Sequence, residues 1–236
     1  MTPMKIALVS DWFAPRVGGV ERHMIDLAAG LRRRGHAVEV VTATPGDAEH
    51  LELPGVPIHR LDVPRLPLWS TVFRPRDGAR LVPFFAARGY DLVHAHSIYS
   101  PLALAAAWAG RELRLPAVLT AHSMVRHAGI AAFRALDYAL MWSSWPSVLT
   151  AVSDAVAADL RRASFAQEVH VLPNGLTIAP PVQRRPARAE LRVVSVMRLV
   201  PRKRPAALVT AFAALCARLG PTRPARLVLV GGGPLG

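Results

Sequence analysis

The feature that most constrains this fold is the alternation of short apolar runs with longer amphipathic stretches. The apolar runs are four to six residues long, which suits buried strands, and apolar residues recur at helical spacing between them. Strands joined by helical crossovers form parallel sheets covered on both faces, so the predicted fold class is α/β. We expect strands at 5–10, 38–42, 58–63, 91–95, 117–121, 148–152, 169–172, 191–196 and 226–230.

The stretches between these runs predict helices, and the loops between the two predict where ligands bind. Open parallel sheets bind ligands at the carboxyl ends of their strands, so residues that directly follow a strand are the candidates for chemistry. We expect helices at 19–34, 78–88, 102–113, 130–143, 154–162 and 205–219.

The alternation is interrupted once, at residues 177–190, which hold three prolines and no apolar period. We interpret this segment as a linker. Residues 1–176 then form a Rossmann-like N-terminal domain, and 191–236 form the start of a second Rossmann-like domain. One strand–helix–strand unit is too small to complete a sheet domain, so we expect the second domain to be truncated.

Charge and cysteine content favour an anionic partner and a reducing compartment. The net charge is +13, which favours phosphorylated substrates, anionic lipid or nucleic acid. Cys216 is the single cysteine, so neither a disulfide framework nor a cysteine-based zinc site is available. The first apolar run is closed by Asp11 and is too short for a signal peptide. We expect a cytoplasmic protein, with peripheral contact at the inner face of an anionic membrane through the helical region that holds Arg126, His127, Arg134 and Trp142.

Two loops after strands have the composition of phosphate-binding sites. Gly18 and Gly19 precede the first helix, where glycines allow close approach and free N–H groups attract anions. The basic run from Arg198 to Arg204, which includes Lys203, follows a strand and precedes a helix. Arg and Lys there could hold a diphosphate. The alternatives are an ordinary strand-to-helix turn and a solvated basic turn.

Other ligand classes have less support. The loop after the first strand lacks the G-x-G-x-x-G spacing of dinucleotide-binding folds, and the second strand ends without the acid that binds the ribose, which argues against an NAD enzyme. His94 and His96 lie two apart on one strand, and we expect them to face opposite sides of the sheet, which argues against joint metal ligation. His122 follows a strand and could hydrogen-bond a sugar, or it could be a satisfied histidine at the sheet edge.

An ordered set of segments resembles family 4 glycosyltransferases, which have the GT-B fold. The segments, in chain order, are PRVGGVERHMIDLAAGLRRRGHAVEVVTA, HAHSIYSPLAL, VLTAHS, TAVSD, VLPNG, VVSVMRLVPRKRP and LVLVGGGPL. They span nearly the whole chain. Two of them, H-S-x-x-S-P-x-A and T-x-H-S, are similar to phosphatidylinositol N-acetylglucosaminyltransferase catalytic subunits and their bacterial relatives.

The resemblance implies a retaining transfer of sugar from a UDP- or GDP-sugar to a lipid or saccharide acceptor. It also implies site residues. Gly18 and Gly19 match the glycine loop at the donor diphosphate, and Arg198 and Lys203 match the cations that neutralise it. His122 matches a histidine near the donor sugar. These cations can substitute for a metal, so we expect no metal ion or other cofactor.

Three further positions carry family features. Asn174 matches the P-N-G turn that leads into the second domain, and Glu21 matches an acid found after the glycine loop. Arg204 departs from the family because glycine is usual there. The family's E-x7-E pair does not occur in the 236 residues, and without it we expect weak transfer or none.

Two alternatives to a transferase stay open. One is a non-catalytic remnant that binds anions, either lipid headgroups or nucleic acid, and the missing carboxylate pair supports it. No nucleic-acid-binding module is recognisable, so we expect no nucleic-acid partner. The other alternative is a sugar-nucleotide epimerase of similar architecture, whose own motifs are not evident.

Overall fold

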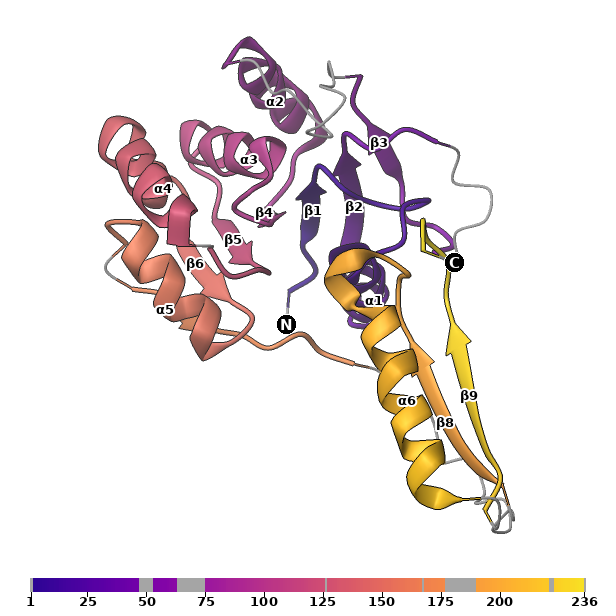
Figure 1. Ribbon diagram of the computed structural model, residues 1–236. Coiled ribbons are helices and arrows are strands. Elements are labelled where there is room, and N and C mark those ends of the chain that lie inside the picture. Colours follow the sequence, from indigo (N-terminus) through magenta and orange to yellow (C-terminus); the bar gives the residue numbers. More distant parts are fainter. Residues whose placement is uncertain are drawn as a thin grey trace. The chain divides into compact units, whose positions relative to one another are not determined.

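The computed structural model describes residues 2–46, 53–62, 75–125, 127–166, 168–176, 190–220 and 223–235. The chain divides into two compact units, Met1–Ile178 and Ala179–Gly236 (Figure 1). The predicted linker, 177–190, lies outside the described residues except for its last position.

Unit 1 is built on a seven-stranded sheet, which confirms the predicted α/β class. The strand order is β3-β2-β1-β4-β5-β6-β7, and every neighbouring pair is parallel. The order reverses between β1 and β4, and open α/β sheets bind ligands at such a point. The strands are β1 (Lys5–Ser10), β2 (Ala37–Thr42), β3 (Ile58–Arg60), β4 (Leu92–His96), β5 (Ala117–Ala121), β6 (Val148–Ala151) and β7 (His170–Val171).

Alternate residues of the strands pack into two cores, one on each face of the sheet. Ile6 and Leu8 of β1 pack against Met24 of α1 (Gly19–Arg33) on one face. Ala7 and Val9 belong to the larger core on the other face. Figure 1 shows the helices of that face, which are α2 (Pro75–Arg88), α3 (Pro101–Glu112), α4 (His127–Leu140) and α5 (Asp154–Ala163).

The helix expected over 130–143 ends at Leu140, three residues early. Met141 adopts a left-handed conformation (φ 53°), and the buried Asp137 carboxylate accepts the N–H groups of Ser143 (2.8 Å) and Phe165 (2.6 Å). Trp142 then turns its ring fully into the core through the 3₁₀ turn η1 (Trp142–Ser144). Of the residues expected at a membrane surface, Trp142 is therefore wrong, because its side chain is fully buried. Among the described residues, no helix has the length and apolarity needed to cross a bilayer.

Unit 2 is one strand–helix–strand motif. β8 (Leu191–Val196) pairs in parallel with β9 (Ala225–Val230), and α6 (Pro205–Leu219) connects them. Three valines of the pair are exposed, Val194 by 56%, Val196 by 77% and Val230 by 47%. Parallel sheets usually bury both faces, whereas these apolar side chains are exposed among the described residues.

Candidate functional site

The loop after β1 brings two predicted residues, Gly18 and Glu21, into contact at the start of α1. Gly18 is the N-cap residue and has an extended backbone (φ −171°). The Glu21 carboxylate is 7% exposed, and its Oε1 atom lies 3.1 Å from Nε of Arg16. A Cβ atom on Gly18 would lie 2.8 Å from Cδ of Glu21. Gly18 is therefore glycine because Glu21 fills the space beside it, and not because of its backbone angles.

Gly19 has a different environment. Apart from its chain neighbours and the backbone of its own helix, no atom of the described residues lies within 4 Å of where its Cβ would be. The first hydrogen bond of α1 runs from the N–H of Arg22 to the carbonyl of Gly18 (3.1 Å), so the amides before Arg22 have no acceptor within the helix. Such amides attract anions. Of the two glycines expected near the donor diphosphate, Gly19 is the one that borders open space.

Polar contacts fix the end of β1 to the start of α3. The buried Ser100 caps α3, and its Oγ accepts the N–H groups of Ala103 (3.0 Å) and Asp11 (3.1 Å). Oδ2 of Asp11 accepts the N–H of Leu102 (3.3 Å). Ser97 is buried and left-handed (φ 77°), a conformation that costs about 1–3 kcal/mol and is common at functional sites. These hydrogen bonds hold the start of α3 against the sheet's carboxyl edge.

His94 and His96 face the same side of the sheet, so the expectation of opposite sides is wrong. Residues two apart on a strand point the same way, and the two rings stack with centroids 4.1 Å apart. Nε2 of His94 lies 2.8 Å from Oγ1 of Thr120, and Nδ1 of His96 lies 3.0 Å from Nε2 of His122. The rings lie on the α1 face, because the His23 ring of α1 is 5.7 Å from that of His96.

Burial keeps these imidazoles neutral. It lowers the pKa of His94 to about 3 and that of His122 to about 4, with neighbouring imidazoles adding to the effect. The pKa of His96 is lowered well below its ordinary value, also mainly by burial. A neutral imidazole has one N–H donor and one acceptor nitrogen. His122 at neutral pH is therefore a hydrogen-bonding group and not a cation.

The structure places His122 beside α1 and Asn174 at the edge of the sheet. His122 directly follows β5, and its ring lies 5.2 Å from that of His23, one helical turn beyond Gly19 on α1. Asn174 is exposed after β7, an edge strand two places along the sheet from β5.

The predicted basic loop lies at the carboxyl ends of β8 and β9 within unit 2. The N–H of Met197 donates to the carbonyl of Val230 (3.0 Å), and the N–H of Leu199 donates to the carbonyl of Gly232 (2.9 Å). These bonds join the loops that follow the two strands. Arg198 lies between the two donors and is exposed, and within the described part of the chain its guanidinium forms no ion pair or hydrogen bond.

Two glycines let these loops approach each other. Gly231 (φ 145°) and Gly233 (φ 153°) both have positive φ angles. A Cβ on Gly231 would overlap the carbonyl of Met197, and one on Gly233 would overlap that of Leu199. The sequence alone does not predict this role of the glycine run, which enters there only through the resemblance. The available signal was three consecutive glycines directly after a strand.

Lys203 ends the 3₁₀ turn η2 (Pro201–Lys203) and is exposed. The next residue, Arg204, is left-handed (φ 54°, ψ 48°). This conformation favours glycine, which is the residue that the resemblance implies at this position, and it costs a non-glycine residue roughly 1 kcal/mol or more. Arg204 therefore retains a glycine-like backbone. The exposed cations of this loop lie side by side along the chain, with Arg202 next to Lys203.

His23 was also missed in the sequence, and the structure places it beside His96 and His122. His23 lies on the buried side of α1, four residues after Gly19. Residues two apart on a strand lie on the same face, so strand alternation predicts that His94 and His96 share one face. No pattern in the sequence pairs that face with His23, because the contact depends on how α1 crosses the sheet.

Comparisons with known proteins identify a family and several relatives. The model of Glycosyltransferase Family 4 matches residues 17–180, more than half of the chain. One subunit of the phosphatidylinositol N-acetylglucosaminyltransferase of Arabidopsis thaliana is 27% identical over 98% of this chain and 53% of its own length. The alpha-monoglucosyldiacylglycerol synthase of Streptococcus pneumoniae is 29% identical over 51% of this chain and 27% of its own length. The chain thus spans about half the length of the first relative and about a quarter of the second within the matched regions.

The fold is shared with solved structures. The crystal structure of Anabaena HepE in complex with UDP-glucose superposes with a TM-score of 0.63 at 22% identity, covering 97% of this chain and 61% of HepE. At this identity the similarity concerns the fold. It supports the predicted GT-B-like architecture.

Proposed function

This chain belongs to glycosyltransferase family 4, and on that premise we propose that the protein transfers a sugar from a UDP- or GDP-sugar to a lipid or saccharide acceptor with retention of configuration. We propose residues 1–176 as the acceptor-side domain and 191–236 as the start of the donor-binding domain, joined by a linker at 177–190. The observation that carries the proposal is the exposed Arg198 and Lys203 at the carboxyl ends of parallel strands.

The chemistry requires stabilisation of a departing diphosphate. When the anomeric C–O bond breaks, its electron pair stays on the diphosphate oxygen while the sugar carbon gains oxocarbenium character. Fixed donors aimed at that developing charge lower the barrier. We assign this role to Arg198 and Lys203, with the open amides beside Gly19 as a second anion-binding group. The bonds that join the loops after β8 and β9 would keep the Arg198 backbone in place during transfer.

His122 is proposed to contact the donor sugar. Its lowered pKa keeps the imidazole neutral, so it can donate or accept one hydrogen bond at a hydroxyl group without repelling the oxocarbenium-like centre. The Nε2 atom that faces His96 orients the ring. Asn174 is assigned to the turn that leads toward the second domain.

A lipid acceptor is favoured over a free saccharide. Both relatives described above have names that refer to lipid substrates. The end of α4 also exposes apolar side chains, with Tyr138 82%, Leu140 50% and Met141 63% exposed. Exposed aromatic and apolar groups next to basic residues suit a membrane surface, and Arg134 of α4 is within 4.4 Å of the Phe165 ring. We propose peripheral contact with an anionic membrane at the end of α4.

Nucleotide titration of the full-length protein tests the donor site. Arg198→Ala and Lys203→Ala should each weaken UDP or GDP binding by about 10–100-fold, because each removes a charge-assisted contact worth about 1.5–3 kcal/mol. Arg226→Ala is the matched control. Arg226 is 62% exposed on β9 and lies 3.8 Å from Glu190. Equal nucleotide affinity in the wild type and both loop variants would defeat the assignment.

A transfer assay separates the enzyme from its alternatives. Radiolabelled UDP- and GDP-sugars are incubated with the full-length protein and lipid or saccharide acceptors. Labelled product supports the transferase. Nucleotide binding without product under any condition favours an anion-binding protein, and conversion of the free sugar nucleotide to an epimer favours an epimerase. The match to a glycosyltransferase family makes the epimerase the weaker alternative.

A further inference from the structure

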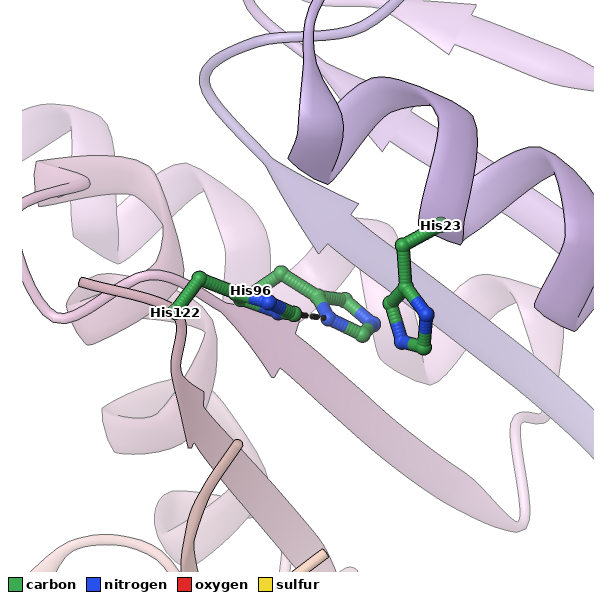
Figure 2. Close-up of side chains that lie close together, drawn as sticks. All are labelled: His23, His96 and His122. Carbon is green, nitrogen blue, oxygen red and sulfur yellow. Dashed lines mark hydrogen bonds between the residues drawn. The ribbon is translucent and has the colours of Figure 1, made fainter. Parts of the chain in front are cut away.

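Three histidines from separate parts of unit 1 meet on the α1 face of the sheet. His23 comes from α1, His96 from the end of β4, and His122 from the loop after β5 (Figure 2). Their ring centroids are 5.2–5.7 Å apart. One nitrogen from each ring lies within 4.8 Å of the other two. Sequence positions 23, 96 and 122 are far apart, so the fold alone creates this cluster.

The cluster has unused ligand atoms. Among the described residues, Nδ1 of His23 and Nε2 of His96 are buried and have no hydrogen-bond partner. His96 is 0% exposed, so bulk solvent does not reach this nitrogen. An unsatisfied buried polar atom costs about 1–3 kcal/mol, and such a group in a native fold calls for an explanation.

The chemical state of the rings suits a transition metal. Metal-binding imidazoles must be neutral at the ligating nitrogen, and burial lowers the pKa of all three rings. For His23 the nearby Asp26 partly opposes this effect. Imidazole is a ligand for Zn²⁺, Cu²⁺, Ni²⁺ and Fe²⁺, whereas Mg²⁺ and Ca²⁺ prefer oxygen.

The geometry points to a binding site for a divalent transition-metal ion of the Zn²⁺ class, held by the imidazoles of His23, His96 and His122. Tetrahedral zinc with bonds of about 2.0–2.1 Å places its ligand nitrogens about 3.4 Å apart. The nitrogens here lie within 4.8 Å, so the rings must close by little more than about 1 Å. Three protein ligands leave a fourth position for water or another small ligand.

The metal site is a binding function separate from the proposed transfer reaction. Transfer is assigned to the cations of the 198–203 loop, and no step of it uses a metal. The metal would take a nitrogen of His122, the residue proposed to contact the donor sugar. A bound metal ion would therefore restrain the His122 ring. Neighbouring contacts already support the cluster, since His94 stacks on His96 and bonds to Thr120, whose hydroxyl lies 2.6 Å from that of Thr150.

Cobalt titration tests the site without relying on activity. The full-length protein is freed of metal by chelation and titrated with Co²⁺, whose visible absorption reports tetrahedral nitrogen ligation, and then with Zn²⁺ in competition. We expect one ion per chain and a tetrahedral spectrum that Zn²⁺ displaces. His23→Gln and His122→Gln should each weaken binding by at least about tenfold. His170→Gln is the control, because His170 is 52% exposed and lies on β7.

A second measurement covers variants that fail to fold. X-ray absorption of the zinc-loaded wild-type protein should show three imidazole ligands at about 2.0–2.1 Å. The proposal is overturned if Co²⁺ gives only an octahedral spectrum, if folded cluster variants bind as tightly as the His170 control, or if absorption shows fewer than three imidazoles. Nucleotide affinity does not enter this test, so its outcome is independent of the proposed transferase function.

Discussion

Glu39 is the charged residue whose removal should change stability most clearly. It lies on β2, where its carboxylate meets groups from three other segments. Oε1 is 3.0 Å from Nζ of Lys5, and Oε2 accepts the hydroxyl of Tyr90 (2.6 Å) and lies 2.7 Å from Nε2 of His59. The Glu39 side chain is 14% exposed. The substitution Glu39→Gln keeps the shape of this side chain and removes its charge.

The magnitude follows from the carboxyl pKa. Burial alone would raise the pKa of Glu39, but hydrogen bonds from Tyr90, Lys5 and His59 outweigh it and lower the pKa from 4.5 to about 2. A carboxyl pKa that is lower by this much in the folded state than in the unfolded state contributes about 3 kcal/mol to the free energy of unfolding at neutral pH. Because the Lys5 side chain remains 32% exposed, we expect Glu39→Gln to cost about 2–3 kcal/mol.

The pH dependence has a definite sign. A carboxyl with a depressed folded pKa stabilises the protein above its unfolded pKa, and this stability is lost as the pH falls toward the folded pKa. Urea unfolding of wild type and Glu39→Gln should therefore show a constant difference above about pH 5.5. Below about pH 4.5 the difference should shrink by about 1.4 kcal/mol per pH unit.

An exposed pair provides the control. Glu168 is 77% exposed and lies 3.5 Å from His170, so Glu168→Gln should change the free energy of unfolding by no more than about 0.5 kcal/mol. A Glu39→Gln difference that is the same at pH 7 and pH 3.5 would refute the reasoning, because it would show that the charge is not its source.

Three further predictions concern single positions. Gly18→Ala should destabilise the protein by about 1–3 kcal/mol in urea unfolding because its Cβ meets Glu21, whereas Gly19→Ala should leave stability within about 0.5 kcal/mol yet weaken nucleotide binding; equal stability of both variants would contradict the packing argument. Asp137→Asn should lower the free energy of unfolding by about 1–3 kcal/mol, since one carboxylate accepts two backbone N–H groups, and an unchanged urea midpoint would count against this. Arg204→Gly should raise stability by about 0.5–1 kcal/mol by relieving its left-handed backbone, and any loss would show that the position is not strained.

The strand and helix pattern was largely predictable because it depends on local periodicity. β1, β5 and β8 begin and end where the apolar runs do. The end of α4 was not predictable, because Asp137 stops the helix by accepting N–H groups from Ser143 and from the distant Phe165. Such a contact exists only once the segments around α4 and α5 have packed.

In the candidate site, too, local features are predictable from the sequence and tertiary contacts are not. A glycine pair before a helix can be read from sequence, but the different reasons for Gly18 and Gly19 require the position of the Glu21 carboxylate. The close approach of Gly231 to Met197 likewise depends on the pairing of β8 with β9. The histidine cluster depends on how α1 crosses the sheet, so His23 carried no local signal.

The most direct test of the account is a structure of the full-length protein with UDP or GDP bound. The guanidinium of Arg198 and the ammonium of Lys203 should lie about 2.7–3.0 Å from pyrophosphate oxygens. A pyrophosphate held elsewhere, with Arg198 directed into solvent away from the nucleotide, would contradict the claim that these cations stabilise the leaving group.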